Sequence, residues 1–253
     1  MSLRRTVAVA RRVATQFRRD HRTIALLLVA PVVVLSLVGA LWGGQAASVP
    51  GRTVLDDLAP GLIALFAFFF IFLLAAVAFL RERTSGTLER ILATPLRRRE
   101  LVAGYLAGFG VFALLQALVI LAFTILVLKV QYRGGLGAIF LVQAVLVVGA
   151  VSLGLAVSAF ARNELQAVQF VPLILLPQVF LSGLLVPVDQ LPDVLRPIAA
   201  VLPLTYAIEA LRSVMIKGYS LGDPLIFRDL GILAAFALLA AVAAVASIRR
   251  EVA

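Results

Sequence analysis

Six long apolar stretches dominate this chain of 253 residues. Each is long enough to cross a hydrocarbon core about 30 Å thick, which takes about 20 mainly apolar residues. Hydrophobic residues make up 62% of the chain and charged residues 14%, whereas proteins on average have about 45–50% and about 25%. We therefore expect an all-α membrane protein with six transmembrane helices. The predicted spans are residues 24–42, 59–80, 101–128, 136–161, 167–186 and 230–248.

The fifth stretch contains Pro172 and Pro177. A proline inside a helix leaves the carbonyl one turn earlier without its hydrogen bond, and in hydrocarbon a neighbouring helix or a water must satisfy that carbonyl. We therefore expect this span to be kinked and packed against protein rather than surrounded by lipid.

The segment before the first span is patterned as an amphipathic helix. Its apolar residues follow one another at steps of four and three positions, and arginine pairs recur every seven residues between them. The pattern predicts an interfacial helix within residues 1–22, lying on the inner membrane surface with its arginines toward lipid phosphates. The alternative is an ordinary basic leader that anchors the first span. The apolar residues are Leu3, Val7, Ala10, Ala14 and Phe17, and the arginines are Arg4, Arg5, Arg11, Arg12, Arg18 and Arg19.

Residues 187–215, between the fifth and sixth spans, are too polar and too rich in proline to form one long helix. Pro187, Pro192, Pro197 and Pro203 suit the first turns of short helices. We expect two short re-entrant helices that dip into the outer leaflet and return, buried against protein because irregular backbone cannot face lipid. The alternative is an extracellular loop that lies flat on the membrane surface.

Most basic residues fall on one side of the membrane in this topology. Six spans place both termini on the same side, and that side carries sixteen of the 23 Lys and Arg residues, Arg249 and Arg250 among them. By the positive-inside rule this side is the cytoplasm, and we expect a multi-pass protein of the bacterial inner membrane with both termini cytoplasmic. The net charge of +10 is explained by topology, so we predict membrane lipids and no nucleic acid as partners.

Residues 81–100, between the second and third spans, form a dense charged segment with strong capping signals. Gly86 followed three positions later by Glu89 can start a short helix, since glycine is tolerated at the cap and glutamate is favoured near a helix N-terminus. Thr94-Pro95 ends this helix and starts the next, because proline disfavours helical geometry in the residue before it and suits the first helical position. The pattern predicts a short helix across the membrane face that can transmit a push to the third span.

These residues closely resemble the cytoplasmic coupling loop of ABC type-2 transporter permeases, and other motifs extend the resemblance over nearly the whole chain. One departure is Tyr105, where many members of the family carry lysine. The motifs are Gly86-Thr87-x-Glu89, Thr94-Pro95 followed by Glu100-Leu101 and Gly104, Leu181-Ser182-Gly183 with Pro187, and Leu202-Pro203-Leu204-Thr205-Tyr206.

In that family a permease pairs with a second permease, identical or paralogous, and with two ATPase subunits, and the complex exports lipids, glycans, drugs or antibiotics. The resemblance implies that residues 1–253 form a single transmembrane domain, the permease of an ATP-driven exporter. ATP and Mg would be bound by the partner ATPase, and this chain would hold no cofactor. Its parts would be an interfacial helix (1–22), two spans (24–80), the coupling loop (81–100), three spans (101–186), extracellular helices (187–215) and a last span (230–248).

The resemblance also implies a set of residues that contact the ATPase subunit. The alternative for this set is a solvated charged loop that obeys the positive-inside rule. The set is Arg83, Gly86, Thr87, Leu88, Glu89, Ile91, Leu92, Thr94 and Pro95.

We place the substrate path or the contact with a second permease on the second and fifth spans. The aromatic residues of the second span suit an amphipathic substrate, although a run of phenylalanines also suits lipid contact or helix packing. The residues are Phe66, Phe69, Phe70, Gln169, Gln178 and Ser182.

Enzymatic function is not predicted. The chain lacks the Gly-x-x-x-x-Gly-Lys-Ser/Thr phosphate loop, so ATP hydrolysis falls to a separate subunit. The single histidine, His21, precedes the first span and there is no cysteine, which leaves no residues for Ser-His catalysis within the membrane or for a Cys- or His-based metal site.

The alternative function is an ion-gradient-driven secondary transporter. Such carriers usually keep Asp, Glu or Arg near the bilayer midplane, whereas the six predicted spans hold only amides and hydroxyls, which more often bridge helices. Glu209 and Arg212, three residues apart, are expected to pair on one helix face. Among the polar residues in the spans are Gln116, Thr124, Gln143, Ser152, Ser158, Gln169, Gln178 and Ser182.

Overall fold

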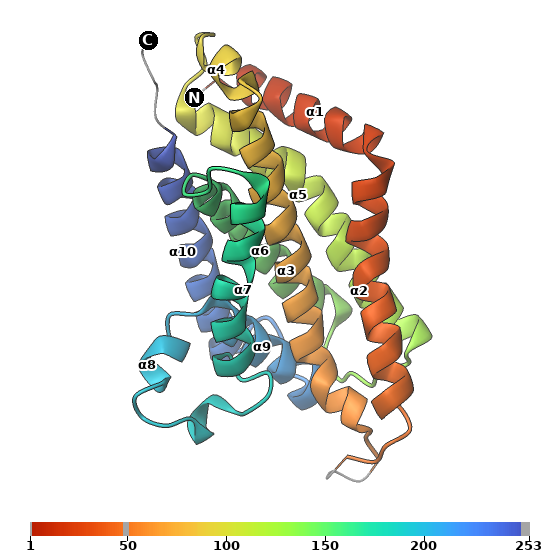
Figure 1. The fold of residues 1–253 in the computed structure, drawn as a ribbon. Helices are drawn as coiled ribbons and strands as arrows, with labels where there is room; N and C mark the ends of the chain where they lie inside the picture. Colours follow the sequence, from red (N-terminus) through yellow and green to blue (C-terminus); the bar gives the residue numbers. More distant parts are fainter. Residues whose placement is uncertain (1, 48–50, 249–253) are drawn as a thin grey trace.

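The computed structural model describes residues 2–47 and 51–248, which form helices joined by short loops (Figure 1). Arg249 and Arg250, counted in the charge balance above, lie outside these residues. Within them, β pairing is limited to one isolated bridge between Ala46 and Thr53. The helices are α1 (Leu3–Arg19), α2 (His21–Trp42), α3 (Val54–Thr84), α4 (Thr87–Leu92), α5 (Arg98–Ala122), α6 (Leu136–Ser158), α7 (Glu164–Leu181), α8 (Arg196–Ala199), α9 (Pro203–Arg212) and α10 (Pro224–Ser247).

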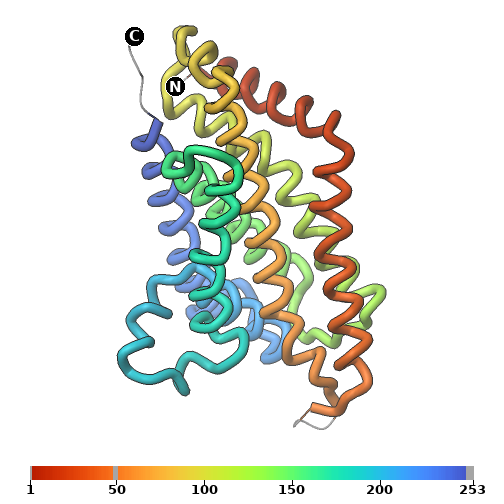
Figure 2. Tube along the Cα trace, in the orientation of Figure 1, coloured from red at the N-terminus to blue at the C-terminus, as the bar shows by residue number. Residues whose placement is uncertain are grey.

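Six of these helices are long and apolar enough to cross a membrane, which confirms the predicted all-α fold with six spans. They are α2, α3, α5 with the π-helical turn Phe123–Val127 that extends it, α6, α7 and α10. Around α3, the spans α2 and α5 lie on one side and α6, α7 and α10 on the other (Figure 2). Spans α3 and α6 form the centre, since 61% and 56% of their most apolar stretches are buried.

Five of the six spans begin earlier than predicted, and α3 and α10 do so by the most, five and six residues, because polar caps start them. Thr53 and Asp56 form a capping box that begins α3 at Val54, and the Asp223 carboxylate accepts from the Leu225 N–H at 3.0 Å at the start of α10. The prediction that the spans contain only amides and hydroxyls is therefore wrong. Helix α10 includes Arg228 and Asp229, close to its first turn.

Helix α1, the last turn of α10 and the short α4 lie at the same end of the bundle, called here the α4 end (Figure 1). The short helices α8 and α9 lie toward the opposite end, where prolines occupy their first or second positions as predicted. Whether they dip into a leaflet stays a prediction.

Helix α1 lies across the α4 end and packs against α5. A Cβ atom added at Gly104 would come within 2.5 Å of the Val9 Cβ, and one added at Gly108 within 2.8 Å of the Val13 Cβ. The two glycines therefore let the helices approach as no larger residue would allow. The face that α1 buries is Thr6, Val9, Val13 and Phe17.

The buried face of α1 is not the predicted apolar stripe. Phe17 belongs to both, but Leu3 and Val7 of the stripe are 74% and 54% exposed. The residues that pack on α5 instead include Val9 and Val13, because Gly104 and Gly108 of α5 allow the closest approach there. Leu3 and Val7 are thus left uncovered, whereas Ala10 and Ala14 are half-buried, and the place of the stripe at the membrane surface stays a prediction.

Span α7 departs from expectation. Only 17% of its most apolar stretch is buried, so the prediction that neighbouring helices surround it is wrong for the single chain. Pro172 and the side chains of Leu173, Leu176 and Phe180 are exposed along it. Any cover for this helix must come from outside the chain.

The chain turns from α1 into α2 at Asp20. The Asp20 carboxylate accepts from the Thr23 N–H at 3.1 Å and from the Thr23 hydroxyl at 2.6 Å, so it caps α2. These hydrogen bonds lower the pKa of Asp20, because they stabilise its ionised form.

We predict that Asp20→Ala lowers the free energy of unfolding by about 1 kcal/mol, since it removes the cap. Thermal unfolding of the purified protein measures this. Because the folded-state pKa lies below the unfolded value of about 3.9, the contribution of the Asp20 charge is present above that pH and is lost as the pH falls through the folded pKa. Asp20→Asn, which keeps a capping side chain, should retain most of the stability at neutral pH; equal losses in both variants would contradict the capping role.

Candidate functional site

The structure forms a short helix, α4, where the charged segment predicts one. Gly86 precedes it with φ 69°, a left-handed conformation that L side chains rarely adopt, and Glu89 lies in its first turn. At its other end the Thr94 hydroxyl donates to the Ile91 carbonyl at 2.6 Å. The elbow between α3 and α4 therefore depends on glycine.

The predicted start of the next helix at Pro95 is wrong by three residues. Helix α5 begins at Arg98, because the Glu100 carboxylate accepts from the Arg97 N–H at 3.0 Å and stabilises the start there. The same carboxylate accepts from the Ser2 N–H at 2.5 Å. Arg5 donates to the Pro95 carbonyl, so the start of α1 holds the second elbow.

The last turn of α3, directly before α4, is joined to two other spans. The Arg83 guanidinium donates to the Ser158 carbonyl at the end of α6, over 2.8 Å. Arg81 makes two hydrogen bonds to Glu164, the first residue of α7, over 2.8 and 3.0 Å. The last turn of α3 is therefore tied to α6 and α7 by polar contacts of its side chains.

Glu82, also in that last turn, joins α3 to α1 and α5. Its buried carboxylate pairs with the Arg12 guanidinium at 3.1 Å and accepts a hydrogen bond from the Tyr105 hydroxyl. Burial lowers the pKa of Arg12, but the attraction and hydrogen bond of Glu82 outweigh it, so the pKa is raised overall. Both partners thus hold Glu82 in place.

The Glu82 contacts give Tyr105 a role that sequence reasoning did not find. Tyr105 is fully buried, and its ring packs edge-on against Phe79 with centroids 5.0 Å apart. Tyr105 carries no positive charge, so the positive charge beside Glu82 is that of Arg12 on α1. The arginines that recur every seven residues were the sequence signal for this contact, because Arg12, which is one of them, lies next to α3.

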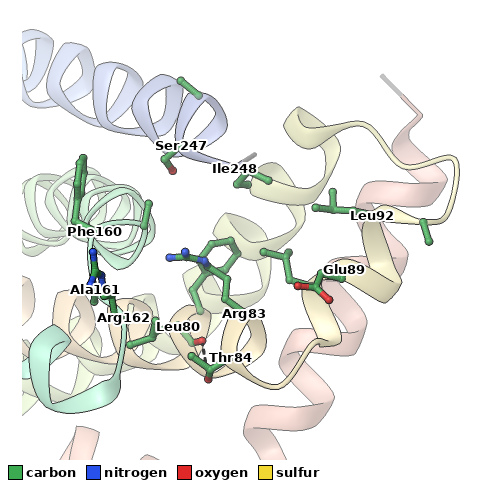
Figure 3. A pocket seen from close by; sticks show the side chains of 15 residues that line it. Leu80, Arg83, Thr84, Glu89, Leu92, Phe160, Ala161, Arg162, Ser247 and Ile248 are labelled. Carbon is green, nitrogen blue, oxygen red and sulfur yellow. Dashed lines mark hydrogen bonds between the residues drawn. The ribbon is translucent and has the colours of Figure 1, made fainter. Parts of the chain in front are cut away.

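A pocket of about 930 Å³ lies beside α4 (Figure 3). Leu88, Glu89 and Leu92 of α4 form one wall, and the connection between α6 and α7, with Phe160 and Arg162, forms another. The end of α10 and the Arg83 side chain complete it. Apolar walls with charges of both signs fit a protein segment better than a small apolar ligand.

The pocket gathers only part of the predicted coupling set. Arg83, Leu88, Glu89 and Leu92 line it. Ile91 instead packs against the hydrophobic core, and Pro95 receives the hydrogen bond from Arg5. The remaining members, Gly86, Thr87 and Thr94, shape the two ends of α4.

The residues predicted for a substrate path lie apart from this pocket. Phe66 is buried, whereas Phe69 and Phe70 are half-buried, with their ring centroids 4.8 Å apart. Gln169 is exposed on α7. Gln178 and Ser182 are buried, and the Gln178 Oε1 and Ser182 Oγ atoms have no hydrogen-bond partner among the described residues.

Two predictions about polar pairs have different outcomes. Gln116 of α5 bridges to α3 by donating to the Phe66 carbonyl at 3.1 Å, as expected for an amide in a span. The predicted pair of Glu209 and Arg212 is wrong, because Glu209 binds Arg228 of α10 at 2.9 Å. Arg228 also binds the neighbouring Asp229 at 2.7 Å, so one arginine serves two carboxylates.

The fold and the charged loop after the second span define a polytopic membrane protein with a rigidly held surface helix. The family model described as "ABC-2 type transporter" matches residues 4–216, so the chain belongs to the ABC-2 type transporter family.

Three relatives illustrate the similarity. ABC transporter G family member 20 of Dictyostelium discoideum is 33% identical over 68% of this chain and 24% of its own length. The probable multidrug ABC transporter permease YbhS of Escherichia coli (strain K12) is 29% identical over 58% of this chain and 39% of its own length. The probable doxorubicin resistance ABC transporter permease protein DrrC of Mycobacterium tuberculosis (strain ATCC 25618 / H37Rv) is 28% identical over 90% of this chain and 81% of its own length. This chain spans well under half the length of the first two relatives.

We predict that Arg12→Gln lowers the free energy of unfolding by about 1–3 kcal/mol, because it leaves the buried Glu82 carboxylate with Tyr105 alone. The low end applies if solvent screens the partly exposed Arg12. Thermal unfolding checks the value. The matched control is Arg11→Gln, which removes the same charge from an exposed position and should change stability by less than about 0.5 kcal/mol; similar losses would rule out a special role for Arg12.

Proposed function

We propose that this chain is the permease subunit of an ATP-driven exporter in a bacterial inner membrane, with both termini in the cytoplasm. The observation that carries the proposal is the placement of α4. Its flanking residues are joined to α1, α5, α6 and α7 by polar contacts, while Glu89 and the adjacent pocket stay open. Such an element can receive a force from another protein and pass it to several spans.

In this mechanism a separate ATPase subunit binds ATP and Mg and presses on α4 when it closes. Leu88, Glu89 and Leu92 face that subunit across the pocket, and Arg83 fixes the base of α3 against α6. The push then tilts α3 and α5 together, since Glu82 and Tyr105 join them. Two copies of the ATPase act on two permeases.

The uncovered α7 supports a second permease copy, identical or paralogous. In hydrocarbon, the carbonyls freed by Pro172 and Pro177 and the exposed Gln169 amide need polar partners. A facing copy, or a path between the two copies, supplies them. We place the path for an amphipathic substrate beside α3 and α7, with Phe66, Phe69, Phe70, Gln169, Gln178 and Ser182 as its candidate residues.

The names of the relatives support export of such a substrate. YbhS is described as a probable multidrug permease and DrrC as a probable doxorubicin resistance permease. The substrate proposed here is accordingly a drug, antibiotic, lipid or glycan with an apolar part.

We predict that Glu89→Arg reduces co-purification of the partner ATPase by on the order of tenfold or more, because it reverses a charge that the docked partner has to complement. Pull-down from membranes and the ATPase activity of the complex measure this. Asp193→Arg, an equal charge reversal at the exposed opposite end, is the control and should leave both unchanged. Undiminished co-purification with Glu89→Arg would remove α4 as the docking helix.

Ion-gradient-driven transport is a second candidate, favoured by the position of Asp229. The side chain is fully buried within α10, and its Oδ2 atom has no partner among the described residues. Buried carboxylates in spans commonly mark ion pathways.

We predict that Asp229→Asn leaves ATP-driven transport within about twofold of the wild type in inside-out vesicles. The substitution keeps the volume of the side chain and the acceptor for Arg228, so packing of α10 is preserved. If uptake instead follows an imposed ion gradient without ATP and disappears in Asp229→Asn, the ion-driven function replaces the ATP-driven one.

A further inference from the structure

The arginines of α1 divide into two rows with different surroundings. Arg5 and Arg12, seven residues apart, point toward residues 81–100, called here the α4 segment. There Arg5 pairs with Glu100 and Arg12 pairs with Glu82. Arg4, Arg11 and Arg18 have the same seven-residue spacing, are all exposed, and form no ion pair with any described residue. The second row, called here the outer row, is thus a line of three charges without a counter-charge among the described residues.

The outer row borders the exposed apolar residues of the same helix. At 100° per residue, Leu3 and Val7 lie between the face that packs on α5 and the outer row. Leu3 and Val7 are 74% and 54% exposed, which is unusual for the side chains beside a packed helix face. Passing round α1, the order is therefore protein contact, apolar stripe, outer row, and then the row that binds the α4 segment.

This order matches the layers of a bilayer surface. Helix α1 runs across the α4 end while packing against the first half of α5, and the flank with Leu3, Val7 and the outer row is exposed (Figure 1). An apolar stripe next to a row of arginines places hydrocarbon contact just below phosphate contact. Residues Arg4, Val7, Ala8 and Arg11 also line a shallow surface groove with room for head groups.

We propose that Arg4, Arg11 and Arg18 form a binding site for anionic phospholipid head groups, with Leu3 and Val7 inserted between the acyl chains beneath. The guanidinium groups donate hydrogen bonds to the phosphate oxygens, as arginine does in a charge-assisted pair. Bound lipid holds α1 at a fixed depth. Arg5 and Arg12 of α1 contact the Pro95 carbonyl and Glu82, so bound lipid also holds the turns before and after α4 in place.

The expected selectivity follows from the charge of the row. Each arginine near an anionic surface contributes on the order of a fivefold preference, and the preference falls with ionic strength. Zwitterionic lipids carry no net charge, so they gain much less. The site does not depend on the partner ATPase, and its test needs only this chain.

The test measures phosphatidylglycerol retained by the full-length protein. Protein reconstituted with equal amounts of phosphatidylglycerol and phosphatidylcholine is extracted into mild detergent, and bound lipids are counted by native mass spectrometry. We expect the wild type to retain phosphatidylglycerol selectively. The triple variant Arg4→Gln, Arg11→Gln, Arg18→Gln should lose on the order of tenfold or more of that selectivity.

The matched control removes three exposed arginines at the same end of the bundle, by Arg90→Gln, Arg97→Gln and Arg99→Gln. It should keep the selectivity of the wild type. Equal losses in both triple variants would reduce the site to bulk charge and overturn it, as would a wild type that retains both lipids alike. If the outer-row variant misfolds by circular dichroism, Arg11→Gln alone should still lower selectivity by about fivefold, and no change would overturn the proposal.

Discussion

Hydrocarbon provides no partner for a free N–H or carbonyl, and this constraint sets the design of the whole chain. Every crossing segment is a helix, and some polar side chains within the spans bond to backbone, as Gln116 does with the Phe66 carbonyl. The ion pairs of the described residues lie toward both ends of the bundle, three at the α4 end and four toward the opposite end. The result is a bundle with an apolar middle and charged contacts at its two ends.

A few polar contacts at the α4 end hold the last turn of α3 in place. Glu82, Arg83 and Arg81 follow one another in a single turn of α3, yet they reach α1, α6 and α7 respectively. Each contact alone contributes modestly, because most are partly exposed. Together they hold the last turn of α3, directly before α4, against three other helices.

The sequence predicted the elements well where a single physical rule decides them. Apolar length located the six spans, and Gly86 followed three positions later by Glu89 marked the start of α4. It failed where distant residues decide. Helix α5 starts at Arg98 because Glu100 caps Arg97 and also binds Ser2, and α1 buries Val9 and Val13 because glycines of α5 accept them. Tyr105 could not be assigned, since its partner Glu82 is brought to it only by the packing of α3 on α5.

The seat of α1 on Gly104 and Gly108 has a consequence for biosynthesis. Val9 leaves the ribosome roughly a hundred residues before its glycine partners, a delay of roughly 5–20 s at translation rates of about 5–20 residues per second. During that interval α1 is already made, with its unpacked face and all its arginines unpaired. The nascent helix therefore lacks its packing partner until α5 has been synthesised and inserted.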